Sequence, residues 1–245
     1  MKAIQNKELS PQAYARIGGV LYLLIIALGI FYELIVRNGI RVPGDALATM
    51  TVLKENELLW RFGIAAELLS SIAGLGLVLI LYRLTQPISK DLALLAAFFN
   101  FSAITVQTAY ILQLVETLFP LSSSVELQAF SSEQLGAMVM LSMKSHAFGF
   151  GIALLMFGPY FLITGYLIFK STYLPRYIGI LYMISGLGYL INSFTLILAP
   201  TRSGIVFMII LLPVFIGEVS LALTLLFKGV NITQWSSKIR ESQNA

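Results

Sequence analysis

Six long apolar stretches constrain this chain more than any other feature of its sequence. Each is long enough to form a helix of ~20 mostly apolar residues, which crosses about 30 Å of hydrocarbon. Backbone groups in lipid must be satisfied within the span, and alternating ten-residue strands are absent. The sequence therefore predicts an all-α, polytopic membrane protein with a bundle of six transmembrane helices. The predicted spans cover approximately residues 17–36, 59–84, 92–119, 146–169, 177–199 and 205–227.

Composition supports this class and excludes several others. Charged residues make up 11% of the chain, whereas soluble domains carry about 25%. The chain has no cysteine and one histidine, which excludes thiolate catalysis and metal sites built on cysteines or paired histidines. We therefore expect no metal and no cofactor. The basic residues are scattered along the chain, which argues against a nucleic-acid partner.

The distribution of Lys and Arg predicts the orientation of the bundle. Ten basic residues fall on one side of the predicted membrane and six on the other. Because cytoplasmic loops carry the excess of positive charge, we expect both termini in the cytoplasm. No Gly/Pro/Ser-rich linker divides the chain, so residues 1–245 are expected to form one membrane domain. The ten residues on the cytoplasmic side are Lys2, Lys7, Arg16, Arg83, Lys90, Lys170, Arg176, Lys228, Lys238 and Arg240.

The fourth span has an unusual length. Ser131 and Gln134 form a capping-box pattern, which is typical of a helix start. A helix from this point to Phe169 would measure about 57 Å, roughly twice what the membrane needs. The sequence leaves two alternatives open: the helix projects outward, or it breaks near Gly149 and Gly151.

Two short patterns concern helix packing and anchoring. Segments 16–22 and 176–182 share Arg, Gly, Leu and Tyr at identical spacing. We interpret both as anchors at the inner interface, with Arg at the headgroups and Tyr in the aromatic belt. The fourth span carries a stripe of glycines on which a neighbouring helix can pack closely. These glycines are Gly151, Gly158 and Gly165.

Polar residues within the spans are the first candidates for a functional site, because lipid penalises them. Counting about 1.5 Å per residue from the inner basic residue of each helix gives their depth. Four helices bring a polar group to one level, about 24–26 Å from that end: Glu33, Glu67, Gln107 and Asn192. Four further residues lie higher, near the outer interface: Arg61, Glu116, Lys144 and His146. These eight residues predict a polar cavity open to the outside, holding a small molecule or a lipid.

Each of these groups also has a plainer interpretation. Glu33 and Arg61 lie at adjacent helix ends, where a salt bridge between them would be natural. Asn100 and Glu218 both lie about 15 Å from the inner end, at the middle of the membrane. A hydrogen bond to Glu218 from Asn100 or from a tyrosine is the structural alternative to a proton or substrate pathway.

Several motifs together resemble a widespread bacterial family of membrane proteins with six helices. They are residues 15–26 (ARIGGVLYLLII), 42–45 (VPGD), 146–149 (HAFG), 165–171 (GYLIFKS) and 174–176 (LPR) with Gly179. This family is catalogued as domain of unknown function 4386, and the resemblance extends from about Ser10 to Lys228. It implies a multi-pass protein of the bacterial cytoplasmic (inner) membrane. It implies no reaction and no catalytic residues.

Three functional hypotheses follow. The first is a protein that binds or transports a small molecule or lipid in the outer-leaflet cavity, with Glu67 and His146 as its titratable pair. The second is a membrane-embedded enzyme acting on a lipid with His146 as base, which requires a carboxylate beside that histidine. The third is a non-catalytic subunit of a homo- or hetero-oligomer. It requires a closed bundle and an exposed glycine stripe.

Overall fold

The computed structural model describes residues 9–243 of the chain, and this part is helical without strands. Six of its helices are long and apolar enough to cross a membrane, as the sequence predicts. In chain order they are α1 with η1 and α2 (Pro11–Ile40), α4 (Glu57–Thr85), α5 with η2 (Lys90–Leu121), α6 (Ser132–Ser171), α7 (Arg176–Leu198) and α8 with η4 (Pro200–Lys228). The shorter helices are α3 (Ala46–Glu55), η3 (Val125–Ala129) and α9 (Ile232–Gln243).

Local sequence signals set the ends of these helices. The side chain of Ser10 caps α1 by accepting a hydrogen bond from the amide of Ala13. Asp45 caps α3 in the same way, at 2.8 Å from the amide nitrogen of Ala48. The capping box of Ser131 and Gln134 at the start of α6 is formed in both directions, which confirms that prediction.

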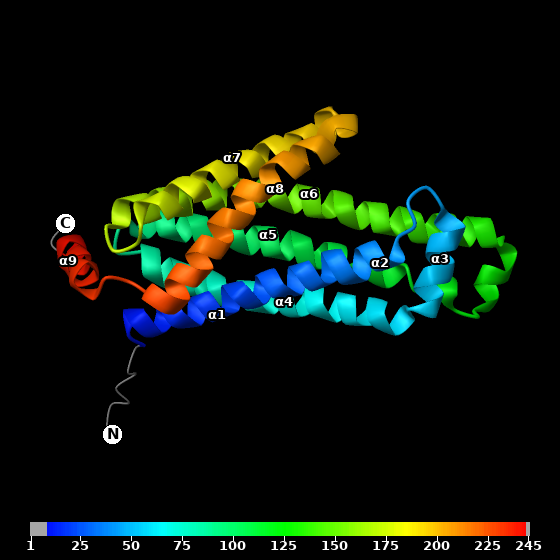
Figure 1. Cartoon of the computed structure of the whole chain (residues 1–245), viewed down its shortest axis with the longest axis horizontal. Coiled ribbons are helices and arrows are strands. Elements are labelled where there is room, and N and C mark those ends of the chain that lie inside the picture. Colours follow the sequence, from blue (N-terminus) through cyan, green and yellow to red (C-terminus); the bar gives the residue numbers. More distant parts are fainter. Residues whose placement is uncertain (1–8, 244–245) are drawn as a thin grey trace, which may run out of the picture.

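The helix α6 runs unbroken for 40 residues. At 1.5 Å per residue it is about 60 Å long, so the projecting alternative is correct and the broken one is wrong. Its N-terminal end extends past the bundle beside α3 (Figure 1). We call this end of the bundle the outer end and the opposite one the inner end, after the orientation expected from the sequence. Gly149 does not break the helix. Instead it lies against the ring of Tyr110 in α5, where a Cβ atom would overlap the ring.

The glycine stripe of α6 packs against α7. Gly165 lies against the backbone of Gly179, and Gly158 faces Gly186 and Leu190. The third glycine of the stripe, Gly151, accepts a hydrogen bond of 2.8 Å at its carbonyl from Ser193. The stripe is therefore covered by a helix of the same chain, which removes the exposed surface that the partner-subunit hypothesis requires.

The repeated tyrosines do not form an aromatic belt. Tyr22 and Tyr182 are both buried, and the hydroxyl of Tyr182 donates to that of Tyr22 at 2.5 Å. The interpretation of both segments as interface anchors is therefore wrong for their tyrosines. The two tyrosines join α1 to α7 inside the bundle, because the helices are parallel and bring matching positions to the same depth.

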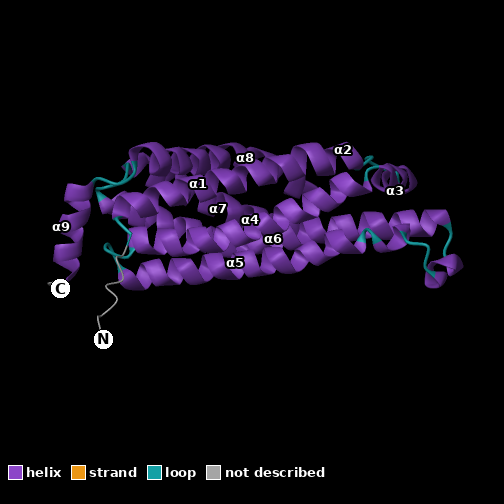
Figure 2. Ribbon diagram, turned by 90° about the horizontal axis from the view of Figure 1, so that it is seen from below, coloured by secondary structure: helices purple, strands orange, loops and turns teal. Residues whose placement is uncertain are grey.

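The buried apolar residues form two separate clusters along the length of the bundle. The first extends from the middle to the inner end, where Trp235 of α9 packs against Tyr173. The second lies at the outer end around Trp60, Tyr32 and Leu53. The described chain begins and ends at the same end of the bundle (Figure 2). Lys2 and Lys7, which enter the charge count, lie outside the described residues.

Candidate functional site

A π-helical segment shapes the outer half of the first span. The helix α1 (Pro11–Ile30) changes to π geometry in η1 (Phe31–Arg37) before α2 (Asn38–Ile40) ends the span. Such insertions are frequent at functional sites because they redirect side chains from the regular helical face. Here the segment carries Tyr32, Glu33 and Arg37. Gly63 of α4 allows close approach, because its Cα lies against Val36 and the ring of Tyr32.

Tyr32 is the centre of a buried polar cluster. The edge of its ring meets the imidazole of His146 with centroids 5.9 Å apart, and Trp60 lies on another side at 6.3 Å. Glu67 of α4 lies close enough to Tyr32 to interact with it electrostatically. Gln107 of α5 lies within hydrogen-bonding reach of the Glu67 carboxyl. We call Tyr32, Glu67, Gln107 and His146 the outer cluster.

Two buried polar atoms in the described part of the chain have no hydrogen-bond partner. They are the hydroxyl oxygen of Tyr32 and Oδ1 of Asn192. Buried polar groups are nearly always hydrogen-bonded, and an unpaired one costs about 1–3 kcal/mol. The orphan hydroxyl of Tyr32 therefore marks the outer cluster as a place that a polar ligand group or water would stabilise.

A pocket of about 130 Å³ opens beside the outer cluster. Its polar lining consists of three cations, Arg37 and Arg41 from the end of the first span and Lys144 from α6. Arg37 connects the pocket to the outer cluster, because its guanidinium acts electrostatically on His146 and Tyr32. The remaining lining is apolar and comes from α6 and α7: Met140, Met143, Ala147, Phe148 and Leu196.

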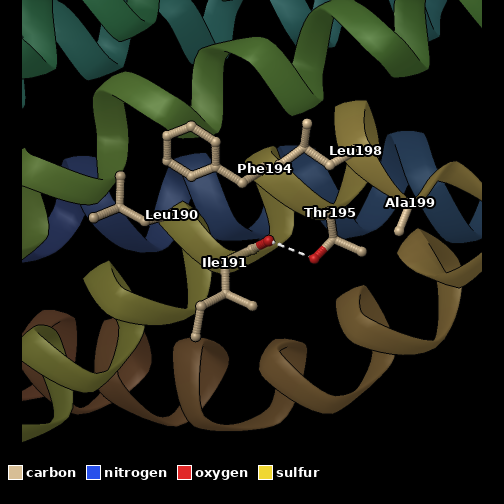
Figure 3. A pocket seen from close by; sticks show the side chains of 6 residues that line it. All are labelled: Leu190, Ile191, Phe194, Thr195, Leu198 and Ala199. Carbon is tan, nitrogen blue, oxygen red and sulfur yellow. Dashed lines mark hydrogen bonds between the residues drawn. The ribbon is translucent and has the colours of Figure 1, made fainter.

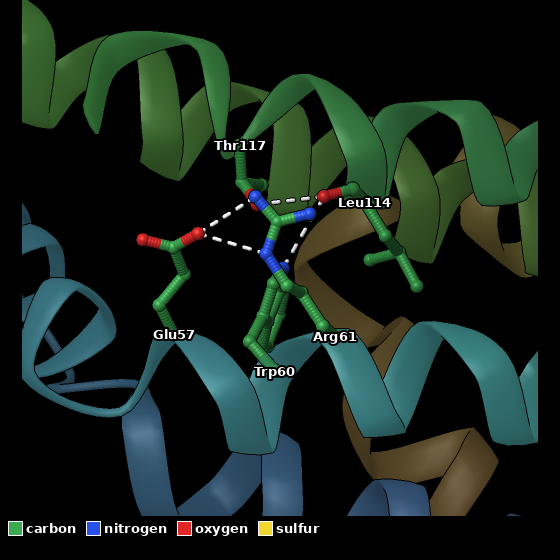
Figure 4. Close-up of polar contacts among 5 residues, drawn as sticks. All are labelled: Glu57, Trp60, Arg61, Leu114 and Thr117. Atoms are coloured by element: carbon green, nitrogen blue, oxygen red, sulfur yellow. Dashed lines mark hydrogen bonds and ion pairs between the residues drawn. The ribbon is translucent and has the colours of Figure 1, made fainter. Parts of the chain in front are cut away.

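The predicted salt bridge between Glu33 and Arg61 is absent. Glu33 pairs instead with Arg37 four residues later in its own helix. Arg61 pairs with Glu57, and its Nε lies 2.8 Å from the carboxylate (Figure 4). Both pairs have the spacing that places side chains on one helix face. Arg61 is exposed and belongs to neither the cluster nor the pocket.

The remaining predicted residues fall into separate environments. Glu116 accepts a hydrogen bond from Gln113, at 3.5 Å, on the face that the two residues share. Asn192 lies one helical turn from Leu196, which lines the pocket. The structure thus brings Glu67, Gln107 and His146 into one cluster and places Lys144 in the adjoining pocket. Tyr32, Arg37 and Arg41 are not among the residues predicted from the sequence, although Glu33 and Arg37 have the spacing of a helical ion pair.

Glu218 and Asn100, the two residues predicted at the middle of the membrane, lie in different environments in the structure. Glu218 of α8 accepts a hydrogen bond of 3.3 Å from the hydroxyl of Tyr189 in α7. The tyrosine alternative is therefore the one observed. Asn100 is buried in α5, a helix that packs mainly against α4 and α6.

A second hollow, of about 370 Å³, lies at the outer end of α7 (Figure 3). It is lined by Leu190, Ile191, Phe194, Thr195, Leu198 and Ala199. Its one polar side chain, Thr195, already donates its hydroxyl hydrogen to the carbonyl of Ile191 at 2.7 Å. The hollow offers no free polar group to orient a ligand. No three His, Cys, Asp or Glu side chains of the described residues are grouped so that they could hold a metal ion.

Comparison with known proteins identifies the family. The model of a family described as domain of unknown function (DUF4386) matches residues 17–229. The chain belongs to this family. The match covers all of the site described above, from η1 to α8. No curated protein and no solved structure matches the chain.

Proposed function

We propose that the protein binds the negatively charged head of an amphiphilic molecule in the outer half of the membrane. The observation that carries this proposal is the convergence of Arg37, Arg41 and Lys144 on one pocket whose remaining lining is apolar. A phosphate-bearing headgroup matches such a set of cations, and Arg in particular binds phosphate through paired hydrogen bonds.

The charge of the pocket is not neutralised by its own residues. Arg37 is paired with Glu33. Neither Arg41 nor Lys144 belongs to an ion pair among the described residues. Two cations without an acidic partner in one pocket favour the binding of an anion. The attraction between the cations and the anion becomes stronger where water is displaced.

The apolar lining suits an acyl chain or another nonpolar tail. Met140 and Met143 are flexible side chains that adapt to different shapes. Phe148 is exposed on α6 beside them. A ligand with its anionic head among the cations would place its tail along these residues.

We propose that this site faces the outside of a bacterial cytoplasmic membrane. The support is the excess of Lys and Arg at the opposite end of the bundle, where the described chain begins and ends. By the positive-inside rule that end lies in the cytoplasm. The ligand would then enter from the outer leaflet.

We do not propose that His146 is a catalytic base. None of the hydrogen bonds among the described residues joins its imidazole to a carboxylate. Its edge contact is Tyr32, and the charge that acts on it is the guanidinium of Arg37. The described contacts of His146 therefore include no carboxylate that would orient it as a general base.

Thermal unfolding in a neutral detergent tests the binding proposal. We expect phosphatidylglycerol to raise the unfolding temperature of the wild type and phosphatidylcholine to raise it much less. A ligand present at 100 times its Kd stabilises a protein by about 2.7 kcal/mol, which such a scan resolves. In the double variant Arg41→Gln/Lys144→Gln, the extra shift caused by phosphatidylglycerol should disappear.

The matched control is the double variant Lys54→Gln/Arg202→Gln. It removes the same charge from exposed positions that do not line the pocket. An equal loss of the phosphatidylglycerol shift in both double variants would reject the pocket as the binding site. A shift of equal size with inorganic phosphate alone would show that the pocket takes a free anion instead of an amphiphile.

A further inference from the structure

The only acid of α8, Glu218, lies in the membrane without a cation. It is about 15 Å from Lys228 along the helix, near the middle of the hydrocarbon. None of the ion pairs among the described residues includes it. Its neighbours Phe215 and Ile216 are exposed, on the surface that faces lipid in a membrane. An acid in this position is stable only if it is protonated or strongly hydrogen-bonded.

Four tyrosines from three other helices lie near this carboxyl, whose residue is itself partly exposed. The hydroxyl of Tyr189 donates to Oε1 of Glu218 at 3.3 Å. Tyr22 of α1, Tyr160 of α6 and Tyr182 of α7 lie close enough to act on Glu218 electrostatically. The helices that pack on α8 are chiefly α7 and α1, and the titratable groups that they bring near Glu218 are neutral phenols.

Aromatic packing holds the phenols in place. Phe161 stacks on Tyr182 with centroids 4.6 Å apart and meets Tyr189 edge-on at 5.2 Å. Tyr182 also donates to Tyr22 at 2.5 Å. The phenols are therefore held by ring packing and by the Tyr182–Tyr22 hydrogen bond, and each hydroxyl group can donate or accept a hydrogen bond. We call these four tyrosines and Glu218 the midplane cluster.

We propose that the midplane cluster is a proton-binding site, in which Glu218 carries an exchangeable proton and releases it reversibly. The tyrosines favour this role because their hydroxyl groups satisfy either protonation state of the carboxyl. Tyr189 donates to the carboxylate, and after rotation of its hydroxyl group the same phenol oxygen can accept from the protonated acid. A Lys or Arg in the same place would fix the carboxylate and prevent proton uptake.

Infrared spectroscopy of the full-length protein in lipid bilayers tests this proposal. We expect the carbonyl stretch of a protonated carboxyl at neutral pH, absent from Glu218→Gln. The band should shift in D₂O, vanish when the pH is raised and return when it is lowered. Glu218→Gln is suited to this test because its amide is neutral and similar in shape to the protonated acid.

A second pair of variants tests the role of the tyrosines. In Tyr189→Phe the carboxylate loses its donor, so the band should persist to higher pH than in the wild type. The control Tyr177→Phe removes the hydroxyl of an exposed tyrosine outside the cluster and should titrate as the wild type does. The proposal is overturned if Glu218→Gln leaves the band unchanged, if the band fails to exchange in D₂O, or if both tyrosine variants titrate like the wild type.

Discussion

The outer cluster and the midplane cluster differ in how completely their polar groups are hydrogen-bonded. Both bring polar side chains into the apolar part of the bundle. Around Tyr32 the polar groups are incompletely paired, and a basic pocket opens beside them. Around Glu218, Tyr189 donates to the carboxyl and Tyr182 donates to Tyr22, among closely packed rings.

This difference is the reason why we propose a ligand in one region and an exchangeable proton in the other. A satisfied polar network is rigid, and adding a group to it would break existing hydrogen bonds. An unsatisfied hydroxyl beside a pocket gains a hydrogen bond from a ligand instead. The outer region therefore suits the binding of a molecule, whereas the midplane region suits the exchange of a proton without rearrangement of heavy atoms. The four predictions that follow test this contrast.

Gly186→Val should cause the largest loss of stability, because it forces apart the helices that hold the midplane cluster. A Cβ atom at this position would lie 2.7 Å from the carbonyl oxygen of Gly158 and 2.8 Å from the amide nitrogen of Leu162. Both are backbone atoms, which move only if α6 and α7 separate. We expect the free energy of unfolding to fall by about 3 kcal/mol. Circular dichroism during thermal unfolding in detergent measures the change.

The control for this variant is Gly29→Val in α1. No atom lies within 4 Å of the Cβ position there, so its effect should remain within about 0.5 kcal/mol. Equal destabilisation by the two substitutions would show that valine itself is poorly tolerated. The close packing of α6 on α7 would then not be the cause.

Trp60→Phe should have the next largest effect and should weaken the outer region specifically. Trp60 is fully buried, and its Nε1 donates to the carbonyl of Leu114 at 3.2 Å (Figure 4). The smaller ring leaves a cavity and loses this bond between α4 and α5, at a cost of about 2 kcal/mol. Because Trp60 packs on Tyr32, the thermal shift caused by phosphatidylglycerol should also decrease. Phe62→Leu, at an exposed position of the same helix, should change neither quantity appreciably.

A double-mutant cycle on Tyr22 and Tyr182 measures how well the midplane network is satisfied. Each single change to Phe leaves one buried hydroxyl without its partner and should cost about 1 kcal/mol. The double variant removes both hydroxyl groups, so it should cost no more than one single variant. Additive costs in urea or thermal unfolding would mean that the two hydroxyl groups do not interact.

The sequence predicts the helices of this protein better than its contacts, for a physical reason. Spans and caps are set by local patterns, such as a run of apolar residues or Ser131 followed by Gln134. Which side of a helix contacts its neighbour depends on how the helix is rotated about its own axis. A helix that is apolar on all sides has no sequence pattern that predicts this rotation. The polar depth count placed Glu67 and Gln107 at one level, and the structure brings these two together. It placed His146 higher, near the outer interface. It also included Arg61, which points elsewhere.

Two kinds of residue in the outer region were beyond the reach of the depth count. Tyr32 is a neutral aromatic residue in an apolar run, so it did not stand out as polar. Its position also depends on the π-helical geometry of η1, which no composition pattern indicates. Arg37 and Arg41 stand at the end of the span, where basic residues are ordinarily interpreted as anchors. Only the approach of α6 shows that they share a pocket with Lys144.

Arg61→Gln should have the smallest effect and marks the boundary of the outer site. Its partner Glu57 lies four residues earlier on an exposed helix face, and such pairs contribute about 0.3–0.5 kcal/mol. We expect the free energy of unfolding to fall by no more than this, with an unchanged phosphatidylglycerol shift. Lys144→Gln is the matched comparison, since it removes one positive charge at a similar height and lines the pocket. It should reduce the lipid shift at little cost in stability. If Arg61→Gln reduced the lipid shift as much as Lys144→Gln, the ligand would respond to the overall positive charge of the outer surface and the pocket would lose its special role.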